Sequence, residues 1–410
     1  MEKLIERKHY IEKLKKWKDK TDLIKIVTGI RRCGKSTLFL LFQNYLKTVG
    51  VQDSQIQNIN LEDMSNAPLL DYKTLHDYVL KNLSEDKMNY VFIDEIQLAA
   101  DFPKAINSLR LRENIDLYVT GSNAYMFSSK IVTLLSGRYI EIKMQPLSFS
   151  EYLSAAPNEN YDKAYQNYLL NSSFPQTLSF QNDKQLIRDY LTGLYSAIIQ
   201  KDIMLRKSIL DFSRLDAVAK FVFSIVGSET SLRNICNVMS SGGRKIYPQT
   251  VESYLDGLCD GYLLYKAGRY DIKGKEILRT NAKYYIADVG LRFALLGVSG
   301  DKGHLLENIV YLELLRRGYD VYIGKIDIYD ANEKKMKTVE VDFVARKPGG
   351  IIEYYQVTET MLGEETSKRE LAPLRAINDN YKKTVITADL PFSNTDNGIE
   401  IKNIIEWLLE

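Results

Sequence analysis

Residues 29–36 of the chain read Gly29-Ile30-Arg31-Arg32-Cys33-Gly34-Lys35-Ser36. This is the spacing GxxxxGK[ST], in which glycines let successive backbone amides fold around phosphates and the start of a helix adds its positive end. The pattern predicts that Lys35 reaches the β- and γ-phosphates of a nucleotide and that Ser36 offers a hydroxyl to Mg²⁺. The expected nucleotide contacts are Gly29, Ile30, Arg31, Arg32, Cys33, Gly34, Lys35, Ser36 and Thr37. The alternative is a flexible glycine turn.

The segments around this loop favour phosphate binding. A β-branched run at 23–28 predicts a strand before the loop, and the pattern at 36–49 predicts a helix after it. Further strands are expected at 56–61, 90–94, 117–120 and 139–144, with helical patterns between most of them. This alternation predicts an α/β fold, a P-loop NTPase with a parallel, doubly wound sheet.

A second motif lies at the end of an apolar strand, Tyr90-Val91-Phe92-Ile93-Asp94-Glu95. Ligands gather at the carboxyl ends of strands in such sheets. Asp94 is therefore expected to hold the Mg²⁺ water shell, and Glu95 to orient and activate the water that attacks the γ-phosphorus. The alternative is a strand that ends in a solvated acidic turn.

Two further candidates follow later strands. Ser122 and Asn123 come directly after the strand at 117–120, where they are expected to touch the γ-phosphate or the attacking water. Arg138 follows Gly137 near a strand and is a candidate arginine finger, acting in cis or from a neighbouring subunit. An ordinary turn and a surface arginine are the respective alternatives.

Composition excludes several classes of protein. The chain has 410 residues, of which 45% are hydrophobic, and its 55 basic and 53 acidic residues nearly cancel. Nucleic-acid binding would therefore need a local basic patch. The three cysteines lack paired spacing and the three histidines are far apart, which argues against disulfides, a zinc site or a histidine-based triad. With no apolar run of membrane length and no signal peptide, we expect a cytoplasmic protein without a membrane partner.

The chain resembles a known group, the AAA-superfamily ATPases of archaea and bacteria that carry a C-terminal domain of uncharacterised function. The resemblance rests on TGIRRCGKSTL, VFIDEIQ, VTGSNA, LSGRY with PLSFSEYL, LYSAIIQKDI, KYYIADVGLR, ENIVYLELLRRGYDVYIGK, EVDFVA and YYQV. It implies an AAA-type ATPase domain at 1–150, a helical and winged-helix-like region at 151–300, and a restriction-endonuclease-like α/β domain at 301–410. It also places Ser122 and Asn123 at the first sensor position and Arg138 at the candidate arginine finger.

The middle region has helix-turn-helix spacing. Helices are expected at 231–239 and 248–260, joined by a glycine-rich turn, and the strand at 262–265 is expected to begin a wing. Basic residues flank the second helix, although the helix itself is not basic: Arg244, Lys245, Lys266, Arg269, Lys273 and Lys275. Winged helices bind DNA or pack against proteins, so both roles remain open.

The last region carries part of a nuclease pattern. A restriction-like nuclease needs an acidic residue, a metal-binding Asp, and a Glu or Gln followed two positions later by Lys. Glu307, Asp342 and Gln356 match, whereas Thr358 occupies the lysine position. Lys368 is a possible substitute. We therefore favour a degenerate domain that binds without cleaving over an active nuclease.

Three functions follow from these patterns. The first is an AAA-type ATPase that uses ATP and Mg²⁺ and whose nucleotide cycle repositions the C-terminal modules on nucleic acid, with a homo-oligomer as a further expectation. The second is a nucleotide-gated protein-binding switch with slow hydrolysis. The third is an ATP-dependent Mg²⁺ nuclease, which Thr358 disfavours.

Overall fold

The computed structural model describes residues 4–124, 134–135, 137–156, 159–297, 302–330, 335–389 and 394–410. The chain divides into two compact units. The first comprises Met1–Pro146, Phe174–Gln176 and Asp260–Tyr262, and the second comprises Leu147–Ser173, Thr177–Cys259 and Leu263–Glu410. The sequence predicts three domains divided after residues 150 and 300. The boundary expected after residue 300 lies inside the second unit.

The first unit contains a five-stranded parallel sheet with the order β2-β3-β4-β1-β5. Its strands are β1 Ile24–Thr28, β2 Ile56–Asn60, β3 Asn89–Asp94, β4 Ile115–Gly121 and β5 Tyr139–Lys143. All five lie where the sequence predicts strands. The α/β class with a parallel sheet, as in P-loop NTPases, is therefore confirmed for this unit.

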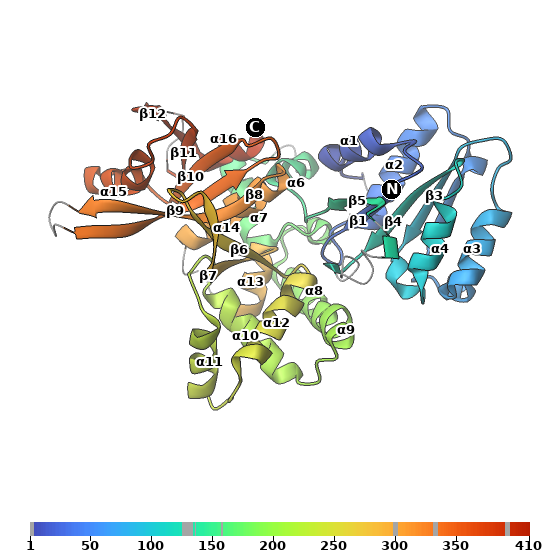
Figure 1. Ribbon diagram of the computed structural model, residues 1–410, viewed down its shortest axis with the longest axis horizontal. Coiled ribbons are helices and arrows are strands. Elements are labelled where there is room, and N and C mark those ends of the chain that lie inside the picture. Colours follow the sequence, from blue (N-terminus) through green and yellow to red (C-terminus); the bar gives the residue numbers. More distant parts are fainter. Residues whose placement is uncertain are drawn as a thin grey trace. The chain divides into compact units, whose positions relative to one another are not determined.

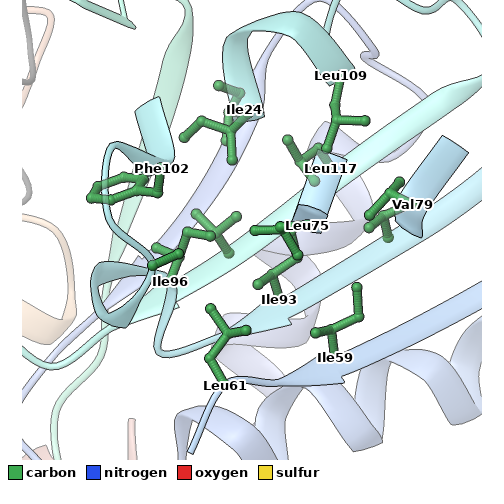
Figure 2. Close-up of a cluster of buried hydrophobic side chains, with 14 of the residues drawn as sticks. Ile24, Ile59, Leu61, Leu75, Val79, Ile93, Ile96, Phe102, Leu109 and Leu117 are labelled. Atoms are coloured by element: carbon green, nitrogen blue, oxygen red, sulfur yellow. The ribbon is translucent and has the colours of Figure 1, made fainter. Parts of the chain in front are cut away.

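Helices cover both faces of this sheet (Figure 1). On one face, α3 (Tyr72–Lys81) and α4 (Phe102–Leu109) pack on alternate strand residues. Figure 2 shows this core, in which Leu75 and Val79 of α3 lie over Ile93 and Leu117. Because successive strand residues point to opposite faces, Phe92 and Tyr118 lie on the other side of the sheet.

That other face is covered by α1 (Lys8–Trp17) and α2 (Lys35–Thr48). The rings of Phe92 and Tyr118 stack with centroids 4.8 Å apart, and Phe39 and Phe42 of α2 pack against them edge-on or tilted. Aromatic side chains bury a large apolar area each, so these contacts hold α2 firmly on the sheet. The loop that precedes α2 is thereby held between the helix and β1.

One ion pair is buried near the amino ends of the strands. Lys25 of β1 contacts Asp116 of β4, and both side chains are fully buried. The second oxygen of Asp116 accepts hydrogen bonds from the Tyr118 hydroxyl at 2.7 Å and the Asp19 amide at 2.9 Å. Burial lowers the pKa of Lys25, and the neighbouring Asp116 carboxylate opposes that shift.

The second unit begins with helices and ends in a mixed sheet (Figure 1). Its first helices are α6 Phe149–Ala155, α7 Tyr161–Asn171, α8 Lys184–Ala197, α9 Leu205–Lys207, α10 Phe212–Ser224, α11 Leu232–Ser241 and α12 Pro248–Asp260. Ser148 and Glu151 form a capping box at the start of α6. Later helices are α13 Val289–Leu296, α14 Lys302–Arg316, α15 Glu364–Arg375 and α16 Ile404–Leu409.

An eight-stranded sheet joins the two downstream regions of the chain, with the order β12-β13-β11-β10-β9-β8-β6-β7. Its strands are β6 Leu264–Asp271, β7 Glu276–Ile286, β8 Asp320–Asp330, β9 Lys335–Arg346, β10 Ile352–Thr358, β11 Lys382–Thr387, β12 Asn394–Asp396 and β13 Ile399–Asn403. The sequence predicts that the strand beginning at 262 starts a wing. In the structure β6 pairs with both β7 and β8, because a free strand edge gains backbone hydrogen bonds by joining a sheet.

Within the residues that the structure describes, no helix has both the length and the apolar character needed to cross a membrane.

Candidate nucleotide-binding site

The loop between β1 and α2 depends on two glycines. Gly29 has φ +149°, and a Cβ atom there would lie 2.1 Å from the carbonyl oxygen of Met144. Gly34 has φ +103° at the start of α2. Both values lie in the region that favours glycine, so a side chain at either position would be strained. The backbone can therefore curl at the carboxyl end of β1, as a phosphate-binding loop requires.

Lys35 and Ser36 begin α2 and face the acidic end of β3. The Lys35 ammonium donates hydrogen bonds to the carbonyl oxygens of Gly29 and Ile30 at 3.1 and 3.4 Å, and lies 3.8 Å from Glu95 Oε1. The Ser36 hydroxyl donates to Asp94 Oδ2 at 2.5 Å. The structure thus brings together the two motifs that the sequence predicts to share one site.

Ser36 and Asp94 fit a Mg²⁺ ion. Mg²⁺ takes oxygen ligands, keeps several waters, and is usually held by one or two protein groups together with substrate phosphates. The Ser36 hydroxyl and the Asp94 carboxylate are hard oxygen donors within hydrogen-bond distance of each other. Ser36 lies in the first turn of α2, where phosphates are also favoured.

Thr120 and Gln97 hold the acidic pair in place, although neither belongs to a motif that the sequence indicates. The Thr120 hydroxyl donates to Asp94 Oδ1 and accepts a hydrogen bond from the Glu95 amide at 2.9 Å. The Gln97 amide donates to Glu95 Oε2 and lies 3.4 Å from the Ser122 hydroxyl. Thr120 could have been found as a polar residue at the carboxyl end of a buried strand. No local signal marks Gln97.

Ser122 and Asn123 lie at the same edge of the sheet, directly after β4, and both are buried. The Gln97 amide donates hydrogen bonds to both the Ser122 hydroxyl and the Glu95 carboxylate, and so connects the two residues. The structure therefore brings Ser122 to the acidic pair. The sensor role of these two residues remains a prediction.

Arg138 lies at the opposite edge. Its carbonyl oxygen accepts a hydrogen bond from the amide of Ile24, the first residue of β1. The phosphate-binding loop follows Thr28, the last residue of that strand. Since β5 runs parallel to β1 from Tyr139 onward, about 15 Å of strand separates Arg138 from the loop at about 3.3 Å per residue. Arg138 is exposed. This placement favours an action on a neighbouring subunit over one in cis, and both stay predictions. Ser136, in the same motif, lies outside the described residues.

The remaining loop residues divide into two groups. Ile30 and Cys33 are buried, and Cys33 Sγ lies 3.7 Å from the carbonyl oxygen of Met144, so these residues can offer a nucleotide only their backbone amides. Burial raises the pKa of the Cys33 thiol. Arg31 pairs with Glu62 at 3.2 Å, while Arg32, with φ 67°, is exposed and Thr37 is half-buried.

Arg7 is a buried cation beside the loop that sequence reasoning missed. Its guanidinium donates hydrogen bonds to the carbonyl oxygens of Cys33 at 3.0 Å and Gln145 at 2.7 Å. It also lies over the ring of Tyr10, 5.0 Å from the centroid. Arg7 thus joins the segment before α1, the phosphate-binding loop and the segment that follows β5.

In the second unit, the predicted helix-turn-helix consists of α11 and α12. Val251, Tyr254, Leu255 and Leu258 of α12 are buried, as the sequence predicts. Arg244 and Lys245, in the turn between the helices, are exposed. Other basic residues are engaged elsewhere, since Arg269 forms an ion pair with Glu229 and Lys273 donates to the carbonyl oxygen of Asp327.

The predicted nuclease residues lie close together in the same unit. Asp342 of β9 accepts a hydrogen bond from the Val357 amide at 2.7 Å, and its own amide donates to Gln356 Oε1 at 3.4 Å. Burial and the Glu307 carboxylate raise the pKa of Asp342 well above its usual value.

The lysine that contacts this cluster is not the one that the sequence suggests. Lys368 pairs with Glu364 on the exposed surface of α15 and thus does not replace the missing lysine. Lys283 of β7 instead contacts Glu307 at 2.8 Å. Burial lowers the pKa of Lys283, but the carboxylates of Glu307, Glu340 and Asp342 together raise it above its ordinary value.

The fold of the first unit and the geometry of its site define a P-loop nucleotide-binding domain of the AAA class. A family model described as an AAA domain matches residues 21–153, and one described as a domain of unknown function (DUF8612) matches residues 162–302. An uncharacterised protein of Haemophilus influenzae is 37% identical over 414 residues, which cover 99% of each chain. The chain belongs to the family of that protein.

More distant similarities agree with this assignment. An uncharacterised protein of Methanocaldococcus jannaschii is 26% identical over 94% of this chain and 88% of its own length. Among solved structures, a Walker-type ATPase of Pyrococcus abyssi has a TM-score of 0.52 at 13% identity, covering 71% of this chain and 95% of its own. At that identity the similarity shows a shared fold.

Proposed function

We propose that the first unit binds Mg-ATP and hydrolyses its terminal phosphoanhydride. The observation that supports this most directly is the meeting of two separate motifs: Lys35 lies 3.8 Å from Glu95, and Ser36 donates a hydrogen bond to Asp94. A phosphate-binding loop alone would support nucleotide binding. A carboxylate that can orient water beside it supports hydrolysis as well.

Each residue has a separate role in this proposal. Lys35 binds the β- and γ-phosphates, and Glu95 orients the attacking water and accepts its proton. Thr120 and Gln97 keep the two carboxylates in position through their hydrogen bonds. Ser36 and Asp94 would hold Mg²⁺, which neutralises charge on the phosphate oxygens when bound. Ser122 and Asn123 lie at the edge that the γ-phosphate would approach.

The position of Arg138 extends this proposal to a homo-oligomer. Arg138 is exposed at the amino ends of the strands, opposite its own loop, which supports an action on the nucleotide of another subunit. We therefore propose a homo-oligomer in which Arg138 of one chain stabilises transition-state charge at the site of the next.

The test is an ATPase assay with the full chain, carried out alone and with single-stranded or duplex DNA, in which the integrity of the DNA is followed in parallel. We expect Mg²⁺-dependent phosphate release from wild type and none from Lys35→Ala. Equal phosphate release by both proteins would refute the site assignment. If the wild-type protein binds ATP but releases no phosphate, the result would favour a nucleotide-gated switch over an ATPase.

For the second unit we propose a role in contacting nucleic acid in the cytoplasm, driven by the nucleotide cycle. In this proposal 151–300 is a helical and winged-helix-like region and 301–410 is a restriction-endonuclease-like domain that binds without cleaving. The exposed Arg244 and Lys245 support contact with phosphates through the turn between α11 and α12. The solvent face of α12 carries Glu252 and Asp256, which disfavours contact along that helix.

A salt titration of labelled-duplex binding separates this role from protein recruitment. Neutralising two phosphate contacts contributes a slope of about −1.8 to log K against log salt, so the variant R244A/K245A should lose about that much slope. The matched control is Lys73→Ala with Lys81→Ala, two exposed lysines on α3 of the first unit. Duplex binding that does not depend on salt, or an equal loss of slope in both double variants, would favour a protein partner.

A further inference from the structure

The Lys283 ammonium lies among three carboxylates in the second unit. It contacts Glu307 Oε1 at 2.8 Å and Glu340 Oε1 at 2.7 Å. Asp342 is the third carboxylate and interacts electrostatically with both Glu307 and Lys283. The three carboxylates come from α14 and β9, whereas the lysine comes from β7. The cluster is therefore assembled by the fold.

At least one oxygen of each carboxylate already contacts a donor of the protein. Glu307 Oε1 accepts hydrogen bonds from both Lys283 and the Tyr285 hydroxyl, the latter at 2.6 Å. Asp342 Oδ2 accepts the Val357 amide at 2.7 Å. The outer oxygen of Glu340 contacts Lys325 at 2.9 Å. Among the described residues, no three His, Cys, Asp or Glu side chains have the arrangement that holds a metal ion.

The chemistry of the donors also disfavours a divalent ion. Mg²⁺ and Ca²⁺ bind carboxylate oxygens directly at about 2.0–2.6 Å, and an ammonium group on the same oxygens would be repelled by the ion. Lys283 has only about 6% of its surface exposed, so it cannot swing into solvent without breaking two buried ion pairs. The residues thus do not fit the metal site that a nuclease of this kind uses.

We propose that the Lys283 ammonium takes the place of the divalent ion, so that Glu307, Glu340, Asp342 and Lys283 form a metal-free charge network that supports the second unit and cleaves no nucleic acid. The comparison with a nuclease rests on the restriction-endonuclease-like fold proposed above. The ion pairs themselves, and the test below, do not depend on ATP hydrolysis.

The alternative hypothesis is that Lys283 is a catalytic lysine displaced from its usual position. A catalytic lysine acts beside a metal whose ligands are the carboxylates. Here Lys283 itself occupies an oxygen of Glu307, which is the first acidic residue of the nuclease pattern. Its position matches that of a ligated cation, because it contacts two carboxylates at once.

The experiment measures Mn²⁺ binding to the nucleotide-free full chain by calorimetry and by paramagnetic resonance. We expect no site of this kind in wild type or in Lys283→Arg, which keeps the charge. Lys283→Met removes the cation and should gain one Mn²⁺ site, with an affinity at least about tenfold above any wild-type binding and a melting temperature raised by Mn²⁺. Adding Asp342→Asn to Lys283→Met should abolish that site.

The variant Lys283→Met leaves its carboxylates unpaired and can fail to fold. The double variant K283M/E340Q removes one charge of each sign while keeping Glu307 and Asp342, and it gives the same test. Absence of Mn²⁺ binding in both folded variants would overturn the proposal. So would Mn²⁺ binding by wild type that Asp342→Asn removes, or wild-type DNA scission in Mg²⁺ or Mn²⁺ that disappears in Asp342→Ala.

Discussion

The guanidinium of Arg7 donates a hydrogen bond to the carbonyl oxygen of Cys33, 3.0 Å away in the phosphate-binding loop. A second hydrogen bond of 2.7 Å reaches the carbonyl oxygen of Gln145, in the segment that follows β5. Both acceptors belong to the first unit, and the guanidinium is almost completely buried. Arg7 is therefore a positioning residue that connects the backbone of the loop to the end of the sheet.

Arg7→Ala should raise the KM for ATP by at least about tenfold, because each hydrogen bond from a charged group is worth about 1.5–3 kcal/mol and the loop loses one. Arg7→Lys should restore part of the affinity. A purely structural role would lower the melting temperature and leave KM unchanged in the folded protein. The matched control is Lys8→Ala, the exposed basic neighbour of Arg7.

Lys35→Ala should abolish nucleotide binding or nearly so. Loss of one partner from a buried charge pair costs about 2–5 kcal/mol, and Lys35 is the cation at the expected phosphates. Binding of a fluorescent ATP analogue measures the effect. Lys47→Ala, an exposed lysine in the last turn of the same helix, should bind as wild type does. Wild-type affinity in Lys35→Ala would move the nucleotide site elsewhere.

Glu95→Gln separates binding from chemistry, since glutamine keeps the shape of the side chain but cannot accept the proton of the attacking water. ATP affinity should remain, and turnover should fall by about a hundredfold or more, the usual scale for a general base. Phosphate release under single-turnover conditions measures this step. Glu113→Gln, an exposed change in the same unit, serves as control. Turnover within a fewfold of wild type would exclude Glu95 as the base.

Arg138→Ala tests the proposed action between subunits. ATP should still bind, and kcat should fall by about a thousandfold or more, as for other arginine fingers. Mixing Arg138→Ala with Glu95→Gln should recover activity, because some interfaces then pair an intact Arg138 with an intact Glu95. Arg112→Ala, another exposed arginine of this unit, should have no effect. A mixture that stays as inactive as its parts would contradict the proposal.

The buried pair of Lys25 and Asp116 should affect stability and leave nucleotide affinity unchanged. Removing one partner of a buried ion pair costs about 3–5 kcal/mol, so Lys25→Met should lower the free energy of unfolding of the first unit by that order. The double variant K25M/D116N should be less destabilised, because asparagine can still accept the hydrogen bonds from Tyr118 and Asp19. Urea unfolding measures both. A double variant less stable than Lys25→Met would contradict this account.

Much of the first unit can be predicted from short stretches of sequence. The five strands, the phosphate-binding loop and the pair Asp94-Glu95 are local patterns, because periodicity and contiguous motifs set them. Strand direction then brings Asp94 beside Ser36, since the carboxyl ends of parallel strands share one edge. Burial of one face of α12 also follows from its periodicity.

The sequence by itself determined the class of the first unit and the two motifs of its candidate site, because each motif is contiguous in the chain and lies at the carboxyl end of a parallel strand. Tertiary structure alone decided which edge of the sheet carries Arg138, which distant groups hold the site, and which cation enters the carboxylate cluster. Arg7 lies 26 residues from Cys33, and Lys283 lies 24 residues from Glu307. Contacts of that range depend on strand order and on the packing of whole elements, which no local pattern encodes.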